Sequence, residues 1–340
     1  MNFRQIPCTM PDRTEADDFL PTASWANLRL RAELLRKVRE FFRMRGFLEV
    51  ETPLLSADTV IDRHVDPFEV PADAAGTTAA GARQLWLQTS PEFAMKRLMA
   101  AGGEAIYQVT RAFRRHELGS LHNPEFTMVE WYRRNDSMAD GMRLLSELCE
   151  ALLNLGPAAL VSYRAAFQQF TGVDPHTASL DELAAVARAR DLAVPDSLDR
   201  RDRDAWLDLL LVFLVEPHLG HPSPVILYDY PASQAALAAV RDGNPPLAER
   251  FELYVRGIEL ANGFHELTDP KVLRERNREN NAARVSDGKP ALPEHSRLLA
   301  AMEHGLPDCT GVALGFDRVV MLAAGARTLA EVMAFPFDRA

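Results

Sequence analysis

Apolar residues recur at helical spacing in several parts of the chain. Between Ser24 and Gly46 they fall every three or four positions, which predicts a helix capped by Ser24 and ended near Gly46. The positions of that stripe are Leu28, Ala32, Leu35, Val38 and Phe42. A similar repeat predicts a helix over 136–155. Ser90-Pro91-Glu92 supplies a cap residue, a proline at the first helical position and an acid in the first turn, so another helix begins there.

Short apolar runs without helical spacing predict strands. These runs lie at 47–55, 85–89, 106–114, 125–132, 225–228, 251–260 and 311–314. An alanine- and leucine-rich section at about 157–220 is mostly helical in pattern, and 71–83 is typical of a hairpin tip or mobile loop. Strands and helices do not alternate as regular βαβ units. We therefore expect an α+β domain built on an antiparallel sheet flanked by helices.

The predicted elements leave little sequence outside one domain. Residues 1–23 are polar, contain three prolines and are predicted to form an extended arm. Residues 24–340 contain neither an internal repeat nor a low-complexity linker, so we expect them to form a single domain.

Composition narrows the class of protein. Apolar residues make up 47% and charged residues 25% of the 340, as in an ordinary globular protein. With 38 Lys and Arg against 48 Asp and Glu, the net charge of −10 excludes a general nucleic-acid coat protein, although a local basic patch stays possible. Cys8, Cys149 and Cys309 are isolated, which indicates a reducing compartment and predicts a cytoplasmic protein. Neither a signal peptide nor an apolar run of the ~20 residues that span a bilayer is present.

Several common catalytic signatures are missing. The chain has no GxGxxG after a strand and no GxxxxGK[ST], so neither dinucleotide binding nor a P-loop is indicated. HExxH and GxSxG are also absent. Any nucleotide chemistry must therefore use another scaffold.

One predicted strand carries polar groups at alternate positions. Phe126, Met128, Glu130 and Tyr132 share a face because strand side chains alternate. This face is either a buried one, on which the carboxylate and the phenol need partners, or the solvent face of a strand whose other side packs inward.

Arginines stand where an anion could bind. Arg114 ends one strand and is followed by a loop with His122 and Asn123, which could hold an oxyanion or be ordinary surface charge. Arg318 lies in the first turn of a predicted helix, where the helix dipole disfavours a cation. A bound anion would explain its place there.

Two carboxylates flank an Asn-Gly pair. Glu259 and Glu266 lie on either side of Asn262-Gly263, which we predict to be a turn. They could chelate a Mg²⁺ that already carries phosphate oxygens, because Mg²⁺ usually takes only one or two protein carboxylates. The alternative is a β-turn with exposed acids.

Together these segments resemble the catalytic domain of class II aminoacyl-tRNA synthetases. Residues 46–53 (GFLEVETP) are similar to motif 1, Phe113-Arg114 with 122–132 (HNPEFTMVEWY) to motif 2, and 311–322 (GVALGFDRVVML) to motif 3. The details are closest to the lysyl branch. The resemblance implies a homodimer formed through motif 1.

The N-terminal region points to a particular subgroup of that branch. Only about 23 residues precede the motif 1 helix, too few for the anticodon-binding barrel of a lysyl-tRNA synthetase. The chain therefore resembles the short paralogues that ligate (R)-β-lysine to a lysine of elongation factor P. Ser90-Pro91-Glu92, Ala313 and the ending AEVMAFPFDRA fit that subgroup. The resemblance implies ATP and Mg²⁺ as cofactors, a protein acceptor and no recognition of a tRNA anticodon.

The resemblance also implies roles for single residues. Catalysis would rest on Arg114 at the α-phosphate and on Arg318, which would stack on adenine opposite Phe126 and hold the γ-phosphate. The ATP site would comprise Arg114, Arg115, His116, His122, Asn123, Phe126, Glu259, Leu260, Gly315 and Arg318. Glu259 and Glu266 would hold the metal. The amino-acid pocket would comprise Ser90, Glu92, Glu130, Tyr132, Asn262, Glu266 and Ala313.

One position departs from the family pattern. Motif 2 normally has Arg-x-Glu, with the glutamate on the adenine amino group, and here His116 takes that place with Glu117 one residue later. Either a neutral imidazole nitrogen accepts the hydrogen bond, or the loop shifts by one and Glu117 accepts it.

The implied reaction has two alternatives. The resemblance predicts formation of an aminoacyl adenylate followed by amide formation on elongation factor P. A truncated lysyl-tRNA synthetase-like enzyme, or another amino-acid adenylating or amide-forming enzyme, would share the site with a different acceptor. A non-catalytic protein that kept the fold is disfavoured by Arg114, Arg318, Glu259 and Glu266.

Overall fold

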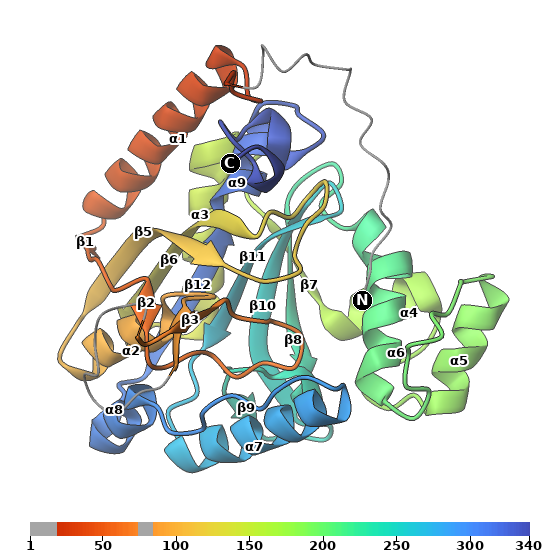
Figure 1. Ribbon diagram of the computed structural model, residues 1–340. Helices are drawn as coiled ribbons and strands as arrows, with labels where there is room; N and C mark the ends of the chain where they lie inside the picture. Colours follow the sequence, from red (N-terminus) through yellow and green to blue (C-terminus); the bar gives the residue numbers. More distant parts are fainter. Residues whose placement is uncertain (1–18, 74–83) are drawn as a thin grey trace. The chain divides into compact units, whose positions relative to one another are not determined.

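The computed structural model describes residues 19–73 and 84–340. Most of the predicted arm and most of the segment 71–83 therefore lie outside the described residues. The chain forms two compact units (Figure 1). Unit 1 comprises the described residues up to Tyr132 with Asp269–Pro307 and Ala313–Ala340, and unit 2 comprises Arg133–Thr268 with Asp308–Val312.

Unit 1 begins with the predicted N-terminal helix. Helix α1 spans Trp25–Arg43, and the Ser24 side chain accepts from the Asn27 backbone N–H as its N-cap. The buried positions are Leu34, Val38, Phe41 and Phe42, so the predicted stripe was rotated by about one residue along part of the helix. Ala32 is exposed, because the two phenylalanines near the end of the helix set the buried face.

Short strands and four further α-helices complete unit 1. The strand order is β1–β5–β6 in one sheet and β2–β4–β3 in a second, with β1 parallel to β5. Helix α8 packs against α2 and α7, and α1 packs against α9. The elements are β1 (Leu48–Glu49), β2 (Leu55–Ser56), β3 (Glu69–Pro71), β4 (Gln84–Leu87), α2 (Glu92–Ala100), β5 (Ala105–Phe113), most of β6 (Glu125–Arg134), α7 (Pro270–Ser286), α8 (Arg297–Gly305), the end of β12 (Cys309–Gly315), α9 (Phe316–Ala323) and the short helices η6 (Leu329–Glu331) and η7 (Phe337–Arg339).

The two ends of unit 1 are joined by backbone hydrogen bonds. Thr22 and Ala23 donate to the carbonyl oxygens of Ala334 and Met333, and the Asn27 side chain donates to the Glu331 carbonyl oxygen. The segment before α1 therefore depends on the segment after α9 for its conformation.

Unit 2 is a mainly antiparallel sheet with helices. Its strand order is β12–β11–β10–β8–β7; β10 is antiparallel to β8 and β11, whereas β7 is parallel to β8. Helix α3 packs on β10 and β11, and α4 packs on β8. The elements are α3 (Met138–Leu153), β7 (Ala159–Ser162), α4 (Tyr163–Thr171), α5 (Leu180–Ala189), α6 (Arg203–Leu210), η3 (Leu211–Val215), η4 (Glu216–His218), β8 (Val225–Pro231), η5 (Ala232–Gln234), β9 (Val240–Arg241), β10 (Leu247–Val255) and β11 (Ile258–His265).

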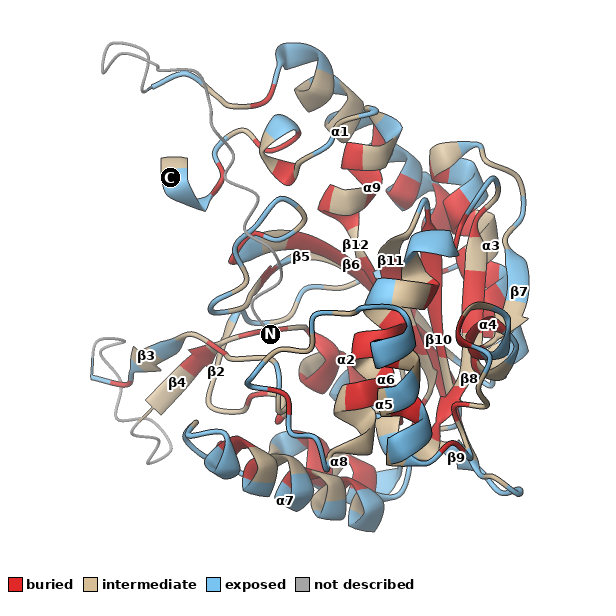
Figure 2. Ribbon diagram, turned by 90° about the vertical axis from the view of Figure 1, so that its right-hand side faces the viewer, coloured by how far each residue is buried: buried red, intermediate tan, exposed pale blue. Residues whose placement is uncertain are grey.

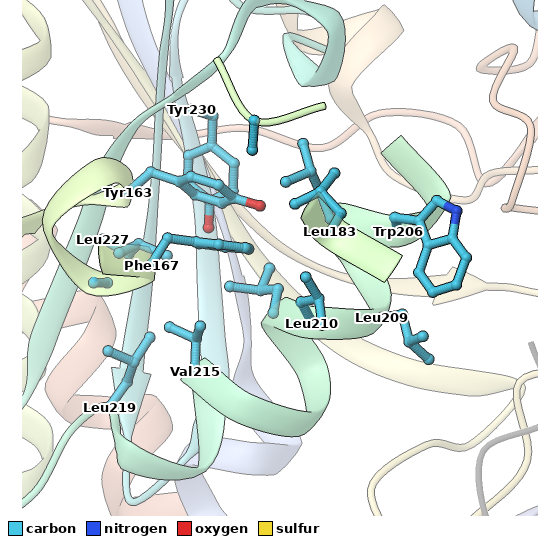
Figure 3. Packing of buried hydrophobic residues seen from close by; sticks show 14 of the residues in the cluster. Tyr163, Phe167, Leu183, Trp206, Leu209, Leu210, Val215, Leu219, Leu227 and Tyr230 are labelled. Atoms are coloured by element: carbon cyan, nitrogen blue, oxygen red, sulfur yellow. The ribbon is translucent and has the colours of Figure 1, made fainter. Parts of the chain in front are cut away.

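The helical section of unit 2 surrounds a core of its own. Tyr163, Phe167 and Leu210 pack with Leu227 and Tyr230 of β8, and all five are at most 1% exposed (Figure 3). Figure 2 shows β10 buried over most of its length. The predicted helical pattern is confirmed here except at the edge strand β7, whose exposed residues give little strand signal.

The predicted Asn-Gly turn is wrong. Asn262 and Gly263 lie inside β11, and the chain instead turns at Arg256-Gly257, where both residues have positive φ. Gly263 is needed for close packing, because a Cβ there would lie 2.4 Å from Cε2 of Phe251. The predicted single strand 251–260 is therefore a hairpin of β10 and β11. The α+β class with a mainly antiparallel sheet is confirmed.

Candidate functional site

The start of α2 is joined to β6 by a serine. Pro91 occupies the N-cap position of α2, and the Ser90 hydroxyl accepts from the Glu92 backbone N–H at 3.0 Å. The same hydroxyl donates to Oε2 of Glu130 at 2.8 Å. Ser90 therefore does more than begin a helix, because it fixes the position of α2 relative to a buried carboxylate.

Glu130 lies on a buried face. Residues Thr127–Tyr132 of β6 are all buried, so the interpretation of this face as the solvent face is wrong. Glu130 is 1% exposed, and its second oxygen accepts from the Tyr132 hydroxyl at 2.7 Å. Both groups thus have the partners that burial demands.

Three ionisable side chains meet beside this strand. Nζ of Lys96 lies 2.5 Å from Oε1 of Glu92, one helical turn away on α2, and the lysine is 2% exposed. Burial and the Glu92 carboxylate raise the pKa of Glu130 to about 7, against the opposing effects of the Tyr132 and Ser90 hydrogen bonds and the Lys96 charge. The group is suited to receive an ammonium group, which would favour the ionised carboxylate.

Arg114 and Phe126 form a cation–aromatic pair. Cζ of Arg114 lies 5.1 Å from the centroid of the Phe126 ring, within the range for attraction to the ring face. The arginine also donates to the Thr89 carbonyl oxygen at 3.3 Å and stays partly accessible. A planar base and an anionic group can thus be held side by side.

Arg318 and His122 are brought together from α9 and the loop after β5. Nη2 of Arg318 donates to Nε2 of His122 at 2.7 Å, and its Nε donates to the Leu121 carbonyl oxygen. Desolvation of the ring and the charges of Arg318 and Arg114 lower the pKa of His122 to about 4. The imidazole is therefore neutral at physiological pH, and the positive charge that the pair presents to an anion is that of Arg318.

Asn123 is engaged within the protein. Its amide nitrogen donates to the Glu125 carbonyl oxygen at 2.6 Å and its amide oxygen accepts from the Phe337 backbone N–H at 2.9 Å. The side chain is buried and links the motif 2 loop to η7. A contact of Asn123 with adenine stays a prediction.

The loop position that departs from the family pattern has an unusual backbone. His116 has φ of 66°, a left-handed conformation, and the Arg115 backbone N–H donates to the Asp66 carbonyl oxygen. The Glu117 carboxylate lies 3.8 Å from Nη1 of Arg114. The conformation at His116 turns the chain so that Glu117 lies beside Arg114.

A buried aspartate joins three elements of unit 1. Asp317 of α9 accepts from Nη1 of Arg31 at 2.5 Å and from the Thr127 backbone N–H at 2.7 Å. Arg31 of α1 also donates to the Thr127 hydroxyl at 2.7 Å. No sequence pattern predicted this network, because its three members lie in segments far apart in the chain. The available signal was an acidic residue directly before Arg318.

A β-bulge determines the faces of β11 in unit 2. Glu259 pairs with Tyr254 and Asn262 with Glu252, so the register shifts by one residue between them. Residues paired directly across an antiparallel ladder share a face. The bulge therefore places Glu259 on the face of Asn262, although an odd offset would otherwise separate them. The corrected picture is a bulged strand in place of a turn.

Acidic and amide groups continue along this part of unit 2. The Glu266 side chain is buried, and its backbone N–H donates to the Cys309 carbonyl oxygen at 3.0 Å. The Asn262 amide oxygen is buried and has no hydrogen-bond partner among the described residues. Such an acceptor requires a donor, which a bound ligand can supply.

A second buried network supports the same face of the hairpin. Glu252 accepts from the Tyr230 and Tyr254 hydroxyls and pairs with Arg250 at 2.5 Å. Glu252 is 5% exposed. No sequence motif predicts this network, since it depends on the pairing of β8 with β10. Its effect is to hold the residues opposite Asn262 rigidly.

The remaining predicted residues lie in strands β11 and β12. Leu260 is the buried bulge residue of β11, Gly315 ends β12 and precedes α9, and Ala313 lies in β12 where unit 1 resumes. The predicted site residues thus fall into a set in unit 1 and a set in unit 2, each internally ordered.

No described group of three His, Cys, Asp or Glu side chains could hold a metal by itself. Mg²⁺ sites commonly use one or two protein carboxylates together with oxygens of the substrate. Over 19–73 and 84–340 there is also no helix with the length and apolar character needed to cross a bilayer.

The sequence matches a known family over nearly its whole length. Residues 18–339 match the tRNA synthetases class II (D, K and N). The chain therefore belongs to this family, and the resemblance drawn from the three motifs is confirmed. Among curated proteins, it is 48% identical over 321 residues to the elongation factor P–(R)-β-lysine ligase of Edwardsiella ictaluri (strain 93-146). That alignment covers 94% of this chain and 98% of the relative.

Proposed function

We propose that this protein is an ATP-dependent ligase that attaches (R)-β-lysine to a lysine side chain of elongation factor P. The observation that carries the proposal is the 48% identity, over nearly the full length of both chains, to a ligase of that name. The ordered arginines and carboxylates of the site support it, because a protein that had lost catalysis would have no need to keep them.

The proposed chemistry has two steps. A carboxylate oxygen of (R)-β-lysine attacks the α-phosphorus of ATP, the bond to the bridging oxygen breaks, and pyrophosphate leaves. The lysine amine of elongation factor P then attacks the acyl carbon, loses a proton and releases AMP. The protein acts by positioning and charge neutralisation, without a protein nucleophile.

The residues of unit 1 suit the nucleotide and the amino acid. Arg114 would neutralise the α-phosphate, Phe126 and Arg318 would enclose adenine, and His122 would bind the phosphate tail. Each is positioned by the contacts described above. The remaining residues proposed for ATP are Arg115, His116, Asn123, Glu259, Leu260 and Gly315, and those proposed for the amino acid are Ser90, Glu92, Glu130, Tyr132, Asn262, Glu266 and Ala313.

Mg²⁺ is the proposed metal. Glu259 and Glu266 would hold it, and the donor set of two carboxylates fits an ion that carries phosphate oxygens. When bound, the ion would supply positive charge to the phosphates of ATP.

The proposal extends to the molecule's setting. We infer a homodimer through α1 and β1, a cytoplasmic location, and no recognition of a tRNA anticodon. Support for the dimer comes from the exposed Trp25, Met44 and Leu48, which are 65–68% accessible on or beside these elements.

Intact mass spectrometry tests the proposal directly. Elongation factor P incubated with enzyme, ATP and (R)-β-lysine should gain the mass of one β-lysyl residue. Arg114→Ala should abolish the gain, whereas Arg111→Ala, at an exposed arginine of β5 three residues earlier, should preserve it.

Two results would contradict the proposal. Absence of a mass gain with efficient lysine transfer to tRNA would identify a synthetase-like enzyme instead. Pyrophosphate exchange that responds to a different amino acid, with none for (R)-β-lysine or α-lysine, would identify another adenylating enzyme.

A further inference from the structure

Lys96 is an unusual residue for its place in the fold. It lies in the middle of α2, is 2% exposed, and its ammonium group contacts Glu92 at 2.5 Å. Fully buried lysines are rare, because the charge loses its hydration. A lysine that served only packing would be replaced by leucine or methionine without that cost.

Lys96 is linked to side chains of the proposed amino-acid pocket. Glu92 is its partner on α2, and Ser90 connects the start of this helix to Glu130 through two hydrogen bonds. The Lys96 charge also acts on Glu130, whose ionised form it favours. The lysine is therefore coupled to both carboxylates of the pocket in unit 1.

We propose that Lys96 is a positioning residue of the amino-acid pocket, which holds the Glu92 carboxylate in place and favours the ionised form of Glu130 for contact with a substrate ammonium group. The inference rests on the proposed function for the identity of the substrate. It adds a built-in cation to a pocket whose other assigned residues are acidic, amide, hydroxyl or small.

Stability alone does not explain this arrangement. A buried ion pair usually contributes little net stability, because desolvation offsets the attraction between the charges. Its effect on a nearby ionisable group is larger, since an opposite charge within a few ångströms lowers the pKa of a carboxyl by about 1–3 units. The groups with the largest effects on the pKa of Glu130 are Glu92, Tyr132, Ser90 and Lys96, and of these four Lys96 carries the positive charge.

Titration of the ligand-free enzyme tests the inference. The carboxyl resonance of Glu130 can be followed by NMR with ¹³C-labelled glutamate and assigned with Glu130→Gln. Lys96→Met should raise the titration midpoint by about one pH unit, because the favourable charge is lost. Lys96→Arg should keep the midpoint of the unmodified enzyme, because it retains the charge.

Pyrophosphate exchange with (R)-β-lysine gives a functional readout. In Lys96→Met the rise of kcat/KM with pH should move to higher pH. The expected loss is about fivefold at pH 7 and very small at pH 9, because Glu130 with a pKa of about 7 is already half protonated at pH 7 in the unmodified enzyme. KM for ATP should stay unchanged, and Lys96→Arg should follow the unmodified enzyme.

A double variant keeps the test valid if Lys96→Met does not fold. Glu92→Gln with Lys96→Met removes both charges of the pair, a change that buried sites tolerate better than loss of one partner. It should leave the Glu130 midpoint at or below that of the unmodified enzyme. An unchanged midpoint in folded Lys96→Met, or a midpoint in the double variant equal to that of Glu92→Gln alone, would overturn the inference.

The two proposals can fail separately. The titration uses no substrate, so its result stands whatever the enzyme activates. If the unmodified enzyme activated no lysine isomer while the midpoint shifted as expected, the proposed function would fail and the positioning of Glu130 by Lys96 would remain.

Discussion

Carboxyl groups in this protein differ according to their immediate surroundings. On the exposed face of α1, the pKa of Glu33 is lowered by its hydrogen bond with Arg36. Glu130 has the opposite shift, because it is buried near a second carboxylate. Of these two carboxyls, the one whose ionised form is disfavoured in the absence of a ligand lies in the proposed pocket. Such a shift is typical of functional sites.

This shift predicts proton release when a substrate ammonium group binds. The pKa of Glu130 in the free enzyme is about 7, above its ordinary value of 4.5, so a fraction of the group is protonated near neutral pH. A bound ammonium group favours the carboxylate and expels that proton. Calorimetry of (R)-β-lysine binding at pH 6.5, in buffers of different ionisation enthalpy, should show net proton release.

The internal control for this measurement is pH. At about pH 9 the carboxyl is already ionised before binding, so its contribution should disappear. Equal proton release at both pH values would contradict the assignment of the shift to Glu130.

The motifs predicted the residues of the candidate site, but not the neighbouring side chains that position them. Arg114, Phe126 and Arg318 were predicted from motifs that each lie within a single segment. In the structure, Arg114 contacts Phe126, and Arg318 contacts His122. Arg31 and Lys96 were missed. Arg31 acts across distant segments, and a lysine four residues after Glu92 is common on solvent-facing helices.

At the scale of elements, helices were predicted better than strands. The capping residue Ser24 correctly predicted the start of α1. Helix α3 begins at Met138, two residues after the predicted start, and Ser137 is its N-cap. The hairpin of β10 and β11 was misplaced, because the Asn-Gly signal for a turn was stronger than that of Arg256-Gly257. Phe251 packs where any side chain at position 263 would lie, and such a long-range contact has no local signal.

That close approach predicts a stability effect. Gly263→Ala would place a methyl group 2.4 Å from Cε2 and 2.5 Å from Cζ of Phe251. Overpacking of a filled core typically costs about 1–3 kcal/mol. Urea unfolding should show the loss, while Gly119→Ala, with no heavy atom within 4 Å of its added Cβ, should stay near the unmodified protein.

A result in which both alanine variants unfolded at the same urea concentration would contradict this account of β11. It would mean that Phe251 can move away at little cost.

At the scale of the whole molecule, the sequence predicted one catalytic domain over 24–340, whereas the chain forms two compact units. The boundary between the two units could not be predicted from the sequence, because no linker marks it. The chain passes between units within β6 and β12 as well as between elements. The prediction of a single domain stays a prediction.

The proposed dimer belongs to this scale. Leu48 of β1 is 65% exposed, and a lysine there would place a charge in an apolar interface. Leu48→Lys should shift the mass measured by sedimentation from dimer to monomer. Leu160→Lys, at a comparably exposed leucine of β7, should leave it unchanged. A monomeric unmodified protein would refute the dimer without affecting the site.

The interleaving of the two units has a consequence for synthesis on the ribosome. Unit 2 has all its residues once position 312 has been made, whereas unit 1 needs residues 313–340. Until these emerge, Arg31 lacks Asp317, and Thr22 and Ala23 lack their backbone acceptors. Chains grow at about 5–20 residues per second, so many seconds pass before Arg31 of α1 can meet Asp317, although Phe42 of the same helix can already pack on Tyr107 and Trp131. The first helix made is thus among the last to be fully packed, and the nascent chain is most open to chaperones and proteases at this helix.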